Sequence, residues 1–382
     1  MPKKIRVLHF LVCLGGGGVE TLLIDFLKRL PENIHFDFLV HHEARRDDEV
    51  RQLGSTVHVL PKEMKSPFKW AKYIEQLVGK HDYDVVHFHR FAFSGNLQYR
   101  LRKKVPVRIA HSHSTHFQGD NIYKKLLYGI YHATINRLLL SIYATDILAC
   151  SNDAGHFLMG SLWTRLKKCR PLFNGIPLDE FKTRMDESDR NSLCNQYGIS
   201  PNAIVIGTLG RLAPIKNHRF LLQVFTKLAE ENRDYVLFIG GEGELKKEIH
   251  QQIKDLSLEG RVILPGYCDN SPALLGNLFD VFCLPSLAEG FGITLAEATA
   301  AGLCSVCSDN LPSDIVSSFP ERIIPVSLNS SHETWGKALK KGISQKKTKI
   351  EGIQWIEDSP FTIDNMLKVL LAIYQREAFV EM

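Results

Sequence analysis

Two glutamates near residue 290 are the side chains best suited, by type and spacing, to do chemistry. They belong to a turn that consists of Glu289, Gly290, Phe291 and Gly292 and to the segment behind it, which holds Glu297. The turn follows an apolar run, and the segment behind it is rich in alanine and leucine, as a helix would be. Free N–H groups at the start of a helix favour a phosphate, and carboxylates accept hydrogen bonds from sugar hydroxyls. The stretch favours a nucleotide-sugar site, although an ordinary strand–helix unit with surface glutamates would fit the turn alone equally well.

Arg211 and Lys216 form a second candidate pair. The spacing places Arg211 at the end of a predicted strand, 203–209, and Lys216 at the start of a predicted helix, 216–230. A forked guanidinium and a compact ammonium together suit a diphosphate. Two solvated surface charges would explain the spacing slightly better, but the glutamate turn on the same predicted sheet shifts the balance towards a diphosphate site.

Four consecutive glycines, Gly15–Gly18, end the first apolar run, 5–14, and precede a predicted helix, 19–30. Glycine allows a backbone to approach a ligand closely, which makes Gly16 and Gly17 candidate binding residues. A plain flexible loop is the alternative. The loop lacks the dinucleotide fingerprint, because no acidic residue ends a clear second strand.

Histidines gather at the ends of two predicted strands. They are His87, His89, His111, His113 and His116. Alternate histidines on a strand share a face, as in some zinc sites. We expect no metal, because no cysteine or acid with ligand spacing accompanies them. Hydrogen-bonded packing is the simpler interpretation of His87, His111 and His116, whereas a functional role is favoured for His113.

Apolar runs alternate with helical segments along the whole chain, which predicts an α/β fold with parallel sheets in two Rossmann-like, doubly wound domains. A polar, charged stretch at 183–195 suggests a connection, so we place the boundary near 180. The predicted domains are residues 1–180 and 181–361. The C-terminal helix, within 362–382, is expected to pack back on the first domain.

The composition is that of a soluble globular protein. The chain has 382 residues, of which 44% are hydrophobic and 23% charged, with a net charge of +5. Residues 1–180 carry a net charge of +9 and the remainder −4. A duplex nucleic acid binder would be more basic and would show a known motif, so no nucleic acid partner is expected. Most of the eight cysteines lie in apolar runs, which indicates reduced thiols in a cytosolic protein.

Several of these motifs together resemble the retaining nucleotide-sugar glycosyltransferases of family 4, which have the GT-B fold, two Rossmann-like domains facing across a cleft. The resemblance covers most of the chain. It is carried by 210–217, with Arg211 and Lys216, and by two glutamates with seven residues between them. The glycine loop and 174–176 add less specific support. The resemblance extends to a subgroup of bacterial exopolysaccharide and capsule enzymes, in which a stretch like 110–114 occurs.

The resemblance implies a role for each candidate residue. Arg211 and Lys216 would stabilise the departing nucleoside diphosphate in place of a metal ion. Glu289 would contact the donor sugar, Glu297 the ribose, and His113 the donor sugar and the acceptor side. The implied donor-binding residues are Gly16, Gly17, Arg211, Lys216, Glu289, Gly290, Phe291, Gly292 and Glu297. No cofactor and no enzymic nucleophile are implied.

The sequence thus predicts a cytoplasmic, retaining glycosyltransferase that uses a nucleotide-diphosphate donor, a UDP-sugar in our interpretation, and a saccharide or lipid-linked acceptor in exopolysaccharide or capsule synthesis. Basic residues of the first half suggest a peripheral position at an anionic membrane surface, on the inner face of the plasma membrane, although a solvated basic face would fit equally well. These residues are Arg100, Arg102, Lys103, Lys104, Lys124, Lys125, Arg165, Lys167, Lys168 and Arg170. A nucleotide-sugar epimerase, a phosphorylase and a non-catalytic nucleotide-sugar sensor remain alternatives.

Overall fold

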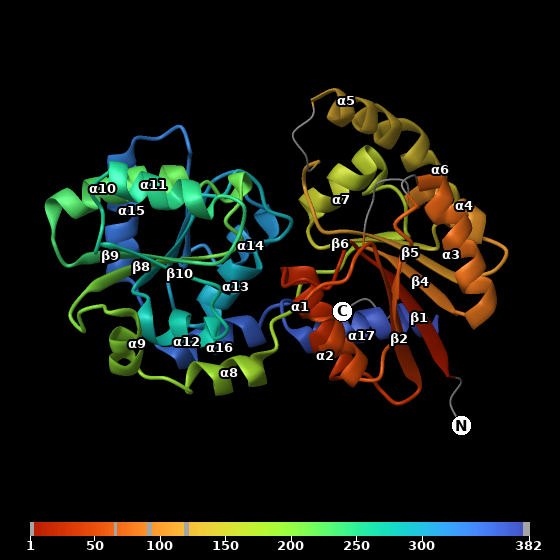
Figure 1. The fold of residues 1–382 in the computed structure, drawn as a ribbon, viewed down its shortest axis with the longest axis horizontal. Coiled ribbons are helices and arrows are strands. Elements are labelled where there is room, and N and C mark those ends of the chain that lie inside the picture. Colours follow the sequence, from red (N-terminus) through yellow and green to blue (C-terminus); the bar gives the residue numbers. More distant parts are fainter. Residues whose placement is uncertain (1–3, 65–66, 90–93, 118–121, 377–382) are drawn as a thin grey trace. The chain divides into compact units, whose positions relative to one another are not determined.

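The computed structural model describes residues 4–64, 67–89, 94–117 and 122–376, and the chain folds as two compact units (Figure 1). Unit 1 comprises the residues up to Asn174 together with those from Asp364 onward, and unit 2 comprises Gly175–Ile363. The sequence placed the boundary near 180, and the structure places it between Asn174 and Gly175.

A parallel sheet forms the centre of unit 1, with the strand order β3-β2-β1-β4-β5-β6-β7. The strands are β1 (Ile5–Phe10), β2 (Ile34–Val40), β3 (Val57–Val59), β4 (Val85–Phe88), β5 (Val107–Ser112), β6 (Asp146–Ala149) and β7 (Cys169–Pro171). The prediction of a parallel α/β sheet is confirmed. The chain adds β2 and β3 on one side of β1 and then crosses to add β4 on the other. This switch point between β1 and β4 is where ligands bind in open α/β sheets.

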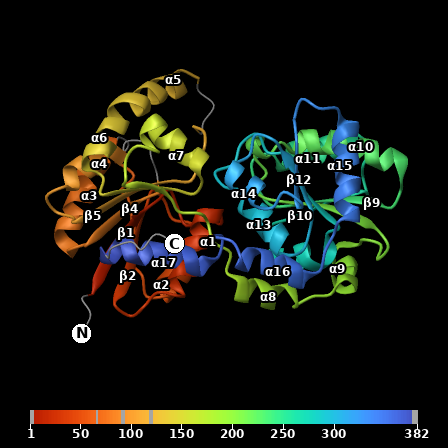
Figure 2. The same ribbon diagram turned by 180° about the vertical axis from the view of Figure 1, so that it is seen from behind.

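Helices cover both faces of the unit 1 sheet. They are α1 (Gly18–Leu27), α2 (Asp47–Gln52), α3 (Pro67–His81), α4 (Ser94–Leu101), α5 (Ile122–Tyr131), α6 (Arg137–Tyr143), α7 (Asn152–Met159) and α17 (Ile363–Gln375), with a π-helical turn η1 (His132–Asn136) and a 3₁₀ turn η2 (Gly160–Leu162). α3, α4 and α6 lie on one face, and α1 and α17 lie on the other (Figures 1 and 2). α17 packs along β1 and β2, since the rings of Tyr374 and Phe36 lie 5.9 Å apart.

Unit 2 has a second parallel sheet, with the strand order β10-β9-β8-β11-β12-β13. Its strands are β8 (Ile204–Leu209), β9 (Tyr235–Gly240), β10 (Val262–Gly266), β11 (Val281–Leu284), β12 (Ser305–Ser308) and β13 (Ile323–Val326). Here the chain reverses its direction of growth between β8 and β11. Gly207 in β8 allows close packing, because a Cβ there would lie 2.1 Å from the ring of Phe279.

Helices also cover both faces of the unit 2 sheet. They are α8 (Leu178–Met185), α9 (Arg190–Tyr197), α10 (His218–Glu231), α11 (Lys246–Asp255), α12 (Ser271–Ala273), α13 (Ile293–Ala300), α14 (Ser313–Ser318), α15 (His332–Ser344) and α16 (Lys349–Glu357), with turns η3 (Pro214–Lys216) and η4 (Leu274–Leu278). α10, α11 and α15 lie on one face, and α9, α13 and α16 lie on the other (Figures 1 and 2). Within the described residues, no helix has the length and apolar character needed to cross a bilayer.

Candidate active site

Lys216 and Glu289 meet at the switch point of unit 2. The Nζ of Lys216, at the end of η3, lies 2.6 Å from Oε1 of Glu289, in the loop after β11. The side chains are 18% and 13% exposed, so water screens the pair only in part. The Oγ of Ser286 donates a hydrogen bond of 2.6 Å to the same carboxylate oxygen. Two residues 73 positions apart are thereby held in one geometry.

Further hydrogen bonds fix the loops that carry this pair. The backbone N–H of Leu287 donates to the carbonyl of Ile215 at 2.8 Å, which joins the loop after β11 to η3. The hydroxyl of Ser308, at the end of β12, donates to the carbonyl of Ser286 at 2.5 Å. Asn217 directly after Lys216 adopts the left-handed region, with φ of 56°, which ends η3 and starts α10. The pair therefore lies on loops that three strands hold in place.

Arg211 lies on the same loop as Lys216, and its side chain is exposed. The loop is packed backbone to backbone against the end of β9, because a Cβ on Gly241, whose φ is +147°, would lie 1.8 Å from the carbonyl oxygen of Gly210. The N–H of Gly210 also donates to the carbonyl of Gly240 at 3.0 Å. Arg211 is therefore near solvent, whereas Lys216 on the same loop is partly buried.

The glutamate turn leads into α13 as the sequence suggested. Gly292, with φ of +92°, precedes the helix, which begins at Ile293. Phe291 is only 2% exposed and packs on Phe361, with ring centroids 5.2 Å apart. Its side chain is therefore part of the core, and any contact it makes with a donor has to come from its backbone. Glu297 is partly exposed on α13.

In unit 1 the glycine loop ends at Gly17, and α1 begins at Gly18. A Cβ on Gly17 would lie 2.5 Å from the Oε2 of Glu20, so this carboxylate folds back over the start of its own helix. A Cβ on Gly16 would lie 3.7 Å from the guanidinium of Arg45. Both glycines thus face charged side chains, and a larger residue at Gly17 would displace Glu20.

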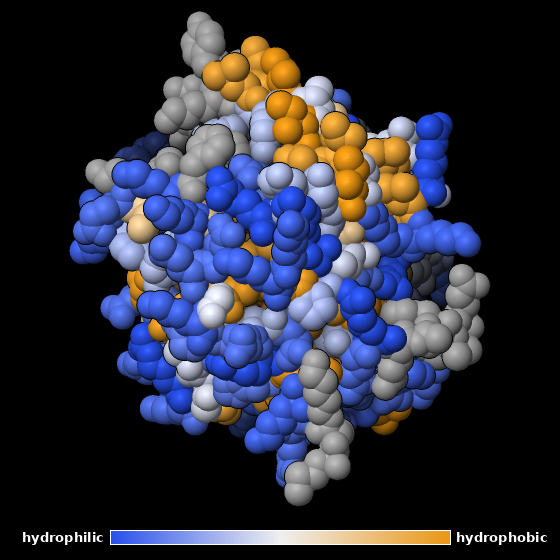
Figure 3. All heavy atoms as spheres, turned by 90° about the vertical axis from the view of Figure 1, so that its right-hand side faces the viewer, coloured by the Kyte–Doolittle hydropathy of each residue, from blue (hydrophilic) through white to orange (hydrophobic). Residues whose placement is uncertain are grey.

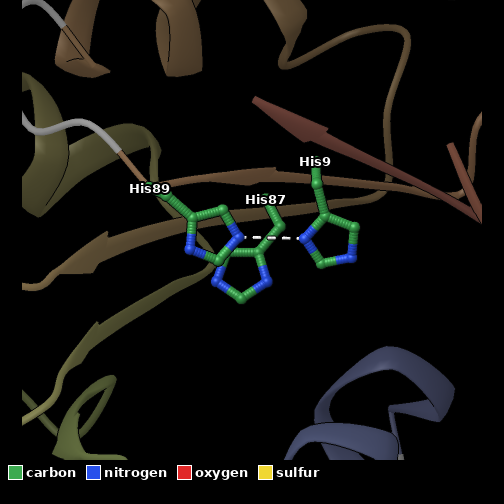
Figure 4. Close-up of side chains that lie close together, drawn as sticks. All are labelled: His9, His87 and His89. Carbon is green, nitrogen blue, oxygen red and sulfur yellow. Dashed lines mark hydrogen bonds between the residues drawn. The ribbon is translucent and has the colours of Figure 1, made fainter. Parts of the chain in front are cut away.

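A cluster of five histidines lies at the switch point of unit 1, and we call it the histidine cluster. Its members are His9, His87, His89, His111 and His113. In β1 and β4, His9 and His87 are register partners, and a ring nitrogen of His9 lies 2.9 Å from one of His89 (Figure 4). Further ring nitrogens are 2.9 Å apart between His89 and His113 and 3.2 Å apart between His87 and His111. The hydroxyl of Tyr374, on α17, lies 2.8 Å from the other nitrogen of His87.

Burial lowers the pKa of every histidine in the cluster, to about 3 for His9 and His113. The imidazoles are therefore neutral at neutral pH, and each offers one donor and one acceptor. Nitrogens of His9, His87 and His89, and of His89, His111 and His113, lie within 4.8 Å of one another, which is also compatible with a metal. The hydrogen bonds within the cluster already engage several of the nitrogens that would have to bind such a metal.

Comparisons with known proteins agree with this architecture. Residues 16–180 match the family model for Glycosyltransferase Family 4, and residues 189–325 match the model for Glycosyl transferases group 1. The O-antigen biosynthesis glycosyltransferase WclY of Escherichia coli is 30% identical over 77% of this chain and 77% of its own. The chain belongs to the family 4 glycosyltransferases. EpsF of Bacillus subtilis (strain 168) is 28% identical to this glycosyltransferase over 91% of the chain and 90% of its own.

The solved structure of Anabaena HepE in complex with UDP has the same fold as this glycosyltransferase, with a TM-score of 0.75 and 17% identity over 96% of this chain and 98% of HepE. The fold is therefore GT-B, as the sequence predicted. Lys216, Glu289 and Arg211 lie on loops of one sheet edge in unit 2, whereas His113 and the glycine loop belong to unit 1.

Three polar residues beside these side chains were missed by the sequence reasoning. They are Ser286, His9 and Tyr374. Ser286 lies three residues before Glu289, at a strand end, and its position alone could have suggested it. His9 interrupts an apolar strand, which is a signal for a buried polar contact. Tyr374 lies 287 residues from His87 and gave no local signal.

Proposed function

We propose that this glycosyltransferase transfers a sugar from a nucleoside diphosphate donor, with retention of the anomeric configuration, to an acceptor in cell-surface polysaccharide synthesis. The observation that carries the proposal is the pairing of Lys216 and Glu289 at the switch point of unit 2, with Arg211 on the same loop. Cations suit a diphosphate, and a carboxylate beside them suits the hydroxyls of the attached sugar.

Named relatives support the choice of donor and acceptor. A 28% identical Escherichia coli protein, matched over 80% of each chain, is named a UDP-Gal:alpha-D-GlcNAc-diphosphoundecaprenol alpha-1,3-galactosyltransferase. HepE has been solved with UDP-glucose. We therefore propose a UDP-sugar as the donor and a lipid-linked saccharide as the acceptor.

The proposed transfer step needs no covalent enzyme intermediate. The bond between the anomeric carbon and the β-phosphate oxygen breaks, and its electron pair stays on the departing diphosphate. The acceptor hydroxyl attacks the anomeric carbon from the same face and gives its proton to that phosphate oxygen. Arg211 and Lys216 stabilise the negative charge that develops on the diphosphate, which is where fixed charge accelerates a reaction. Glu289 orients Lys216 and contacts the sugar.

Substitution of the lysine tests the proposal. Lys216→Met should lower kcat for a UDP-sugar at least tenfold, a barrier increase of about 1.4 kcal/mol, while the folded structure persists. Lys227→Met is the matched control, since Lys227 forms a surface pair with Glu230 on α10 and should leave kcat unchanged. The anomeric proton coupling of the product, measured by NMR, reports retention or inversion.

Two results would contradict the proposal. If Lys216→Met turns over the donor at the wild-type rate, the diphosphate does not lie at this pair. If the product has the inverted anomeric configuration, same-face attack is wrong even where the binding residues are right.

A further inference from the structure

Ser286 carries a buried hydroxyl beside the candidate active site, and the proposed transfer step gives it no role. It lies two residues after the end of β11 and is 0% exposed. Its Oγ donates a hydrogen bond of 2.6 Å to Oε1 of Glu289, and the Nζ of Lys216 lies 2.6 Å from the same oxygen. A neutral hydroxyl brings no charge to a diphosphate, and a side chain this deeply buried is out of reach of a ligand in solution. Any effect of Ser286 on the reaction therefore passes through Glu289.

The neighbouring strand holds the backbone of Ser286 in place. Ser308, at the end of β12, is also 0% exposed, and its hydroxyl donates to the carbonyl of Ser286 at 2.5 Å. The side-chain amide of Asn310 donates to the carbonyl of Leu287 at 2.6 Å. These two bonds fasten residues 286 and 287 to the loop after β12. Ser286 therefore presents its proton to Glu289 from a backbone that has little freedom to move.

The proposed transfer step makes the two partners of Glu289 unequal. Lys216 has to interact with the diphosphate of the donor, so it turns away from Glu289 or divides its three donors between the two groups. Ser286 has one proton and is enclosed by the protein, so its bond to Glu289 persists through that change. A hydrogen bond to a carboxylate is stronger than one between neutral groups. Ser286 is therefore the partner that keeps Glu289 oriented while Lys216 contacts the phosphate.

We infer that Ser286 is a positioning residue for sugar transfer, which holds the carboxylate of Glu289 towards the donor sugar after Lys216 has turned to the diphosphate. The inference rests on the proposed function and deepens it, because it assigns a role to a residue that touches neither substrate. Loss of the hydroxyl then affects turnover more than the binding of UDP, since UDP lacks the sugar that Glu289 contacts. The loss also requires that Glu289 be present.

Kinetics and calorimetry on the full chain test the inference. The donor is the one that the wild type uses fastest among UDP-glucose, UDP-galactose and their N-acetylamino derivatives, with turnover measured as UDP release. Ser286→Ala should lower kcat about tenfold and change the Kd of UDP less than about threefold, because a hydrogen bond to a charged group is lost while the cations stay. Ser286→Cys, which keeps a side chain of similar size with a weaker donor, should also lower kcat.

Ser305→Ala is the matched control. Ser305 lies at the other end of β12, roughly 10 Å along the strand from Ser308, and is 0% exposed. Within the described residues its hydroxyl has no hydrogen-bond partner. The substitution therefore removes a buried hydroxyl from the same unit without removing a hydrogen bond, and kcat should stay at the wild-type value.

A double-mutant cycle separates positioning from a general loss of packing. In a Glu289→Ala background, Ser286→Ala should change the turnover less than about twofold, since the group that it positions is gone. Single-turnover rates give the comparison where this background is too slow for steady-state measurement. Exposed hydrophobic residues gather over α5 and α6 of unit 1 (Figure 3), so every variant is measured in non-ionic detergent at two protein concentrations, which excludes self-association as a cause of lost turnover.

Three results would overturn the inference. They are a Ser286→Ala variant with wild-type kcat, an equal loss of kcat in the presence and absence of Glu289, and an equal loss of kcat in Ser286→Ala and Ser305→Ala. Other variants decide the proposed function. If Lys216→Met and Glu289→Ala lower kcat while Ser286→Ala does not, only the role of Ser286 falls. If Lys216→Met leaves kcat unchanged, the proposed site itself is wrong.

Discussion

Acid should weaken unit 1 through its buried histidines. His9, His87 and His111 are at most 2% exposed, and burial holds the pKa of each below the ordinary value of 6.5. The folded state keeps them neutral, whereas the unfolded chain takes up protons once the pH falls below about 6.5. The stabilisation is therefore complete above that pH and is lost progressively as the pH decreases.

The size of the loss follows from proton linkage. Between about pH 7.5 and about pH 5.5, each histidine that stays neutral in the folded state lowers the free energy of unfolding by about 1.4 kcal/mol, because the unfolded chain takes up a proton there. Three such histidines give a loss of about 4 kcal/mol, and the partly buried His89 and His113 add to it. Asp37, whose carboxylate favours a charged His9, has a lowered pKa of its own, so its contribution is lost only below about pH 4.

Hydrogen exchange measured by mass spectrometry can resolve this effect by unit. After correction for the intrinsic exchange rate, protection of peptides from β1, β4 and β5 should fall about a thousandfold over this pH range. Peptides from β8 and β9 should lose far less protection. All residues of unit 2 are described, and His218 is the one buried histidine among them whose pKa is lowered. His9→Phe, placed between Phe36 and Phe38, should reduce the loss in unit 1 by about 1.4 kcal/mol, the contribution of one such histidine.

His250→Gln, at an exposed position of unit 2, is the control and should leave the loss in unit 1 unchanged. A loss below about 1 kcal/mol in unit 1, or an equal loss in both units, would refute the reasoning, because the buried imidazoles would then have protonated without cost.

Three further predictions concern unit 2 and the dependence of activity on metal ions. Glu289→Gln removes the charged partner of Lys216, so we expect UDP to bind at least as tightly in calorimetry while kcat falls at least tenfold; clearly weaker UDP binding would show that Glu289 assists the diphosphate directly. Activity should persist in excess EDTA after dialysis, since fixed cations take the role of a metal in the proposed step, and loss of activity that zinc restores would instead assign a metal to the histidine cluster. Gly241→Ala should destabilise unit 2 by roughly 2 kcal/mol or more in urea unfolding, because its Cβ would collide with the carbonyl of Gly210, whereas Gly260→Ala, with φ of +74° and open space around it, should cost roughly 1 kcal/mol; equal costs would contradict the close backbone contact.

The strands of both sheets were predictable because parallel strands covered on two faces are continuous apolar runs. The predicted strand 203–209 occurs in the structure as β8, Ile204–Leu209. Helix ends were less well predicted. The predicted helix at 216–230 begins at His218, because Lys216 ends a separate 3₁₀ turn and Asn217 takes a left-handed conformation that the sequence did not reveal.

Long-range side-chain partners were the least predictable part. The sequence identified Lys216 and Glu289 as members of one site, but not that they would pair directly, since that contact depends on the loops joined at Leu287. The rotation of the helix formed by α5, η1 and α6 is fixed by Asn136 and its contact with Gly95 at the start of α4, which no local pattern encodes.

The two switch points differ in charge, and this difference suggests how the two units divide the reaction. Unit 2 places fixed cations and a carboxylate at its switch point, which suits a donor with a charged diphosphate. The switch point of unit 1 instead carries imidazoles, which burial keeps neutral. Neutral rings can donate hydrogen bonds to hydroxyls and accept hydrogen bonds from them without attracting an anion. Under the proposed function, unit 1 therefore suits the uncharged part of a saccharide better than a phosphate. The Glu20 carboxylate over the start of α1 adds to this preference, because it occupies the helix N-terminus that an anion would otherwise approach.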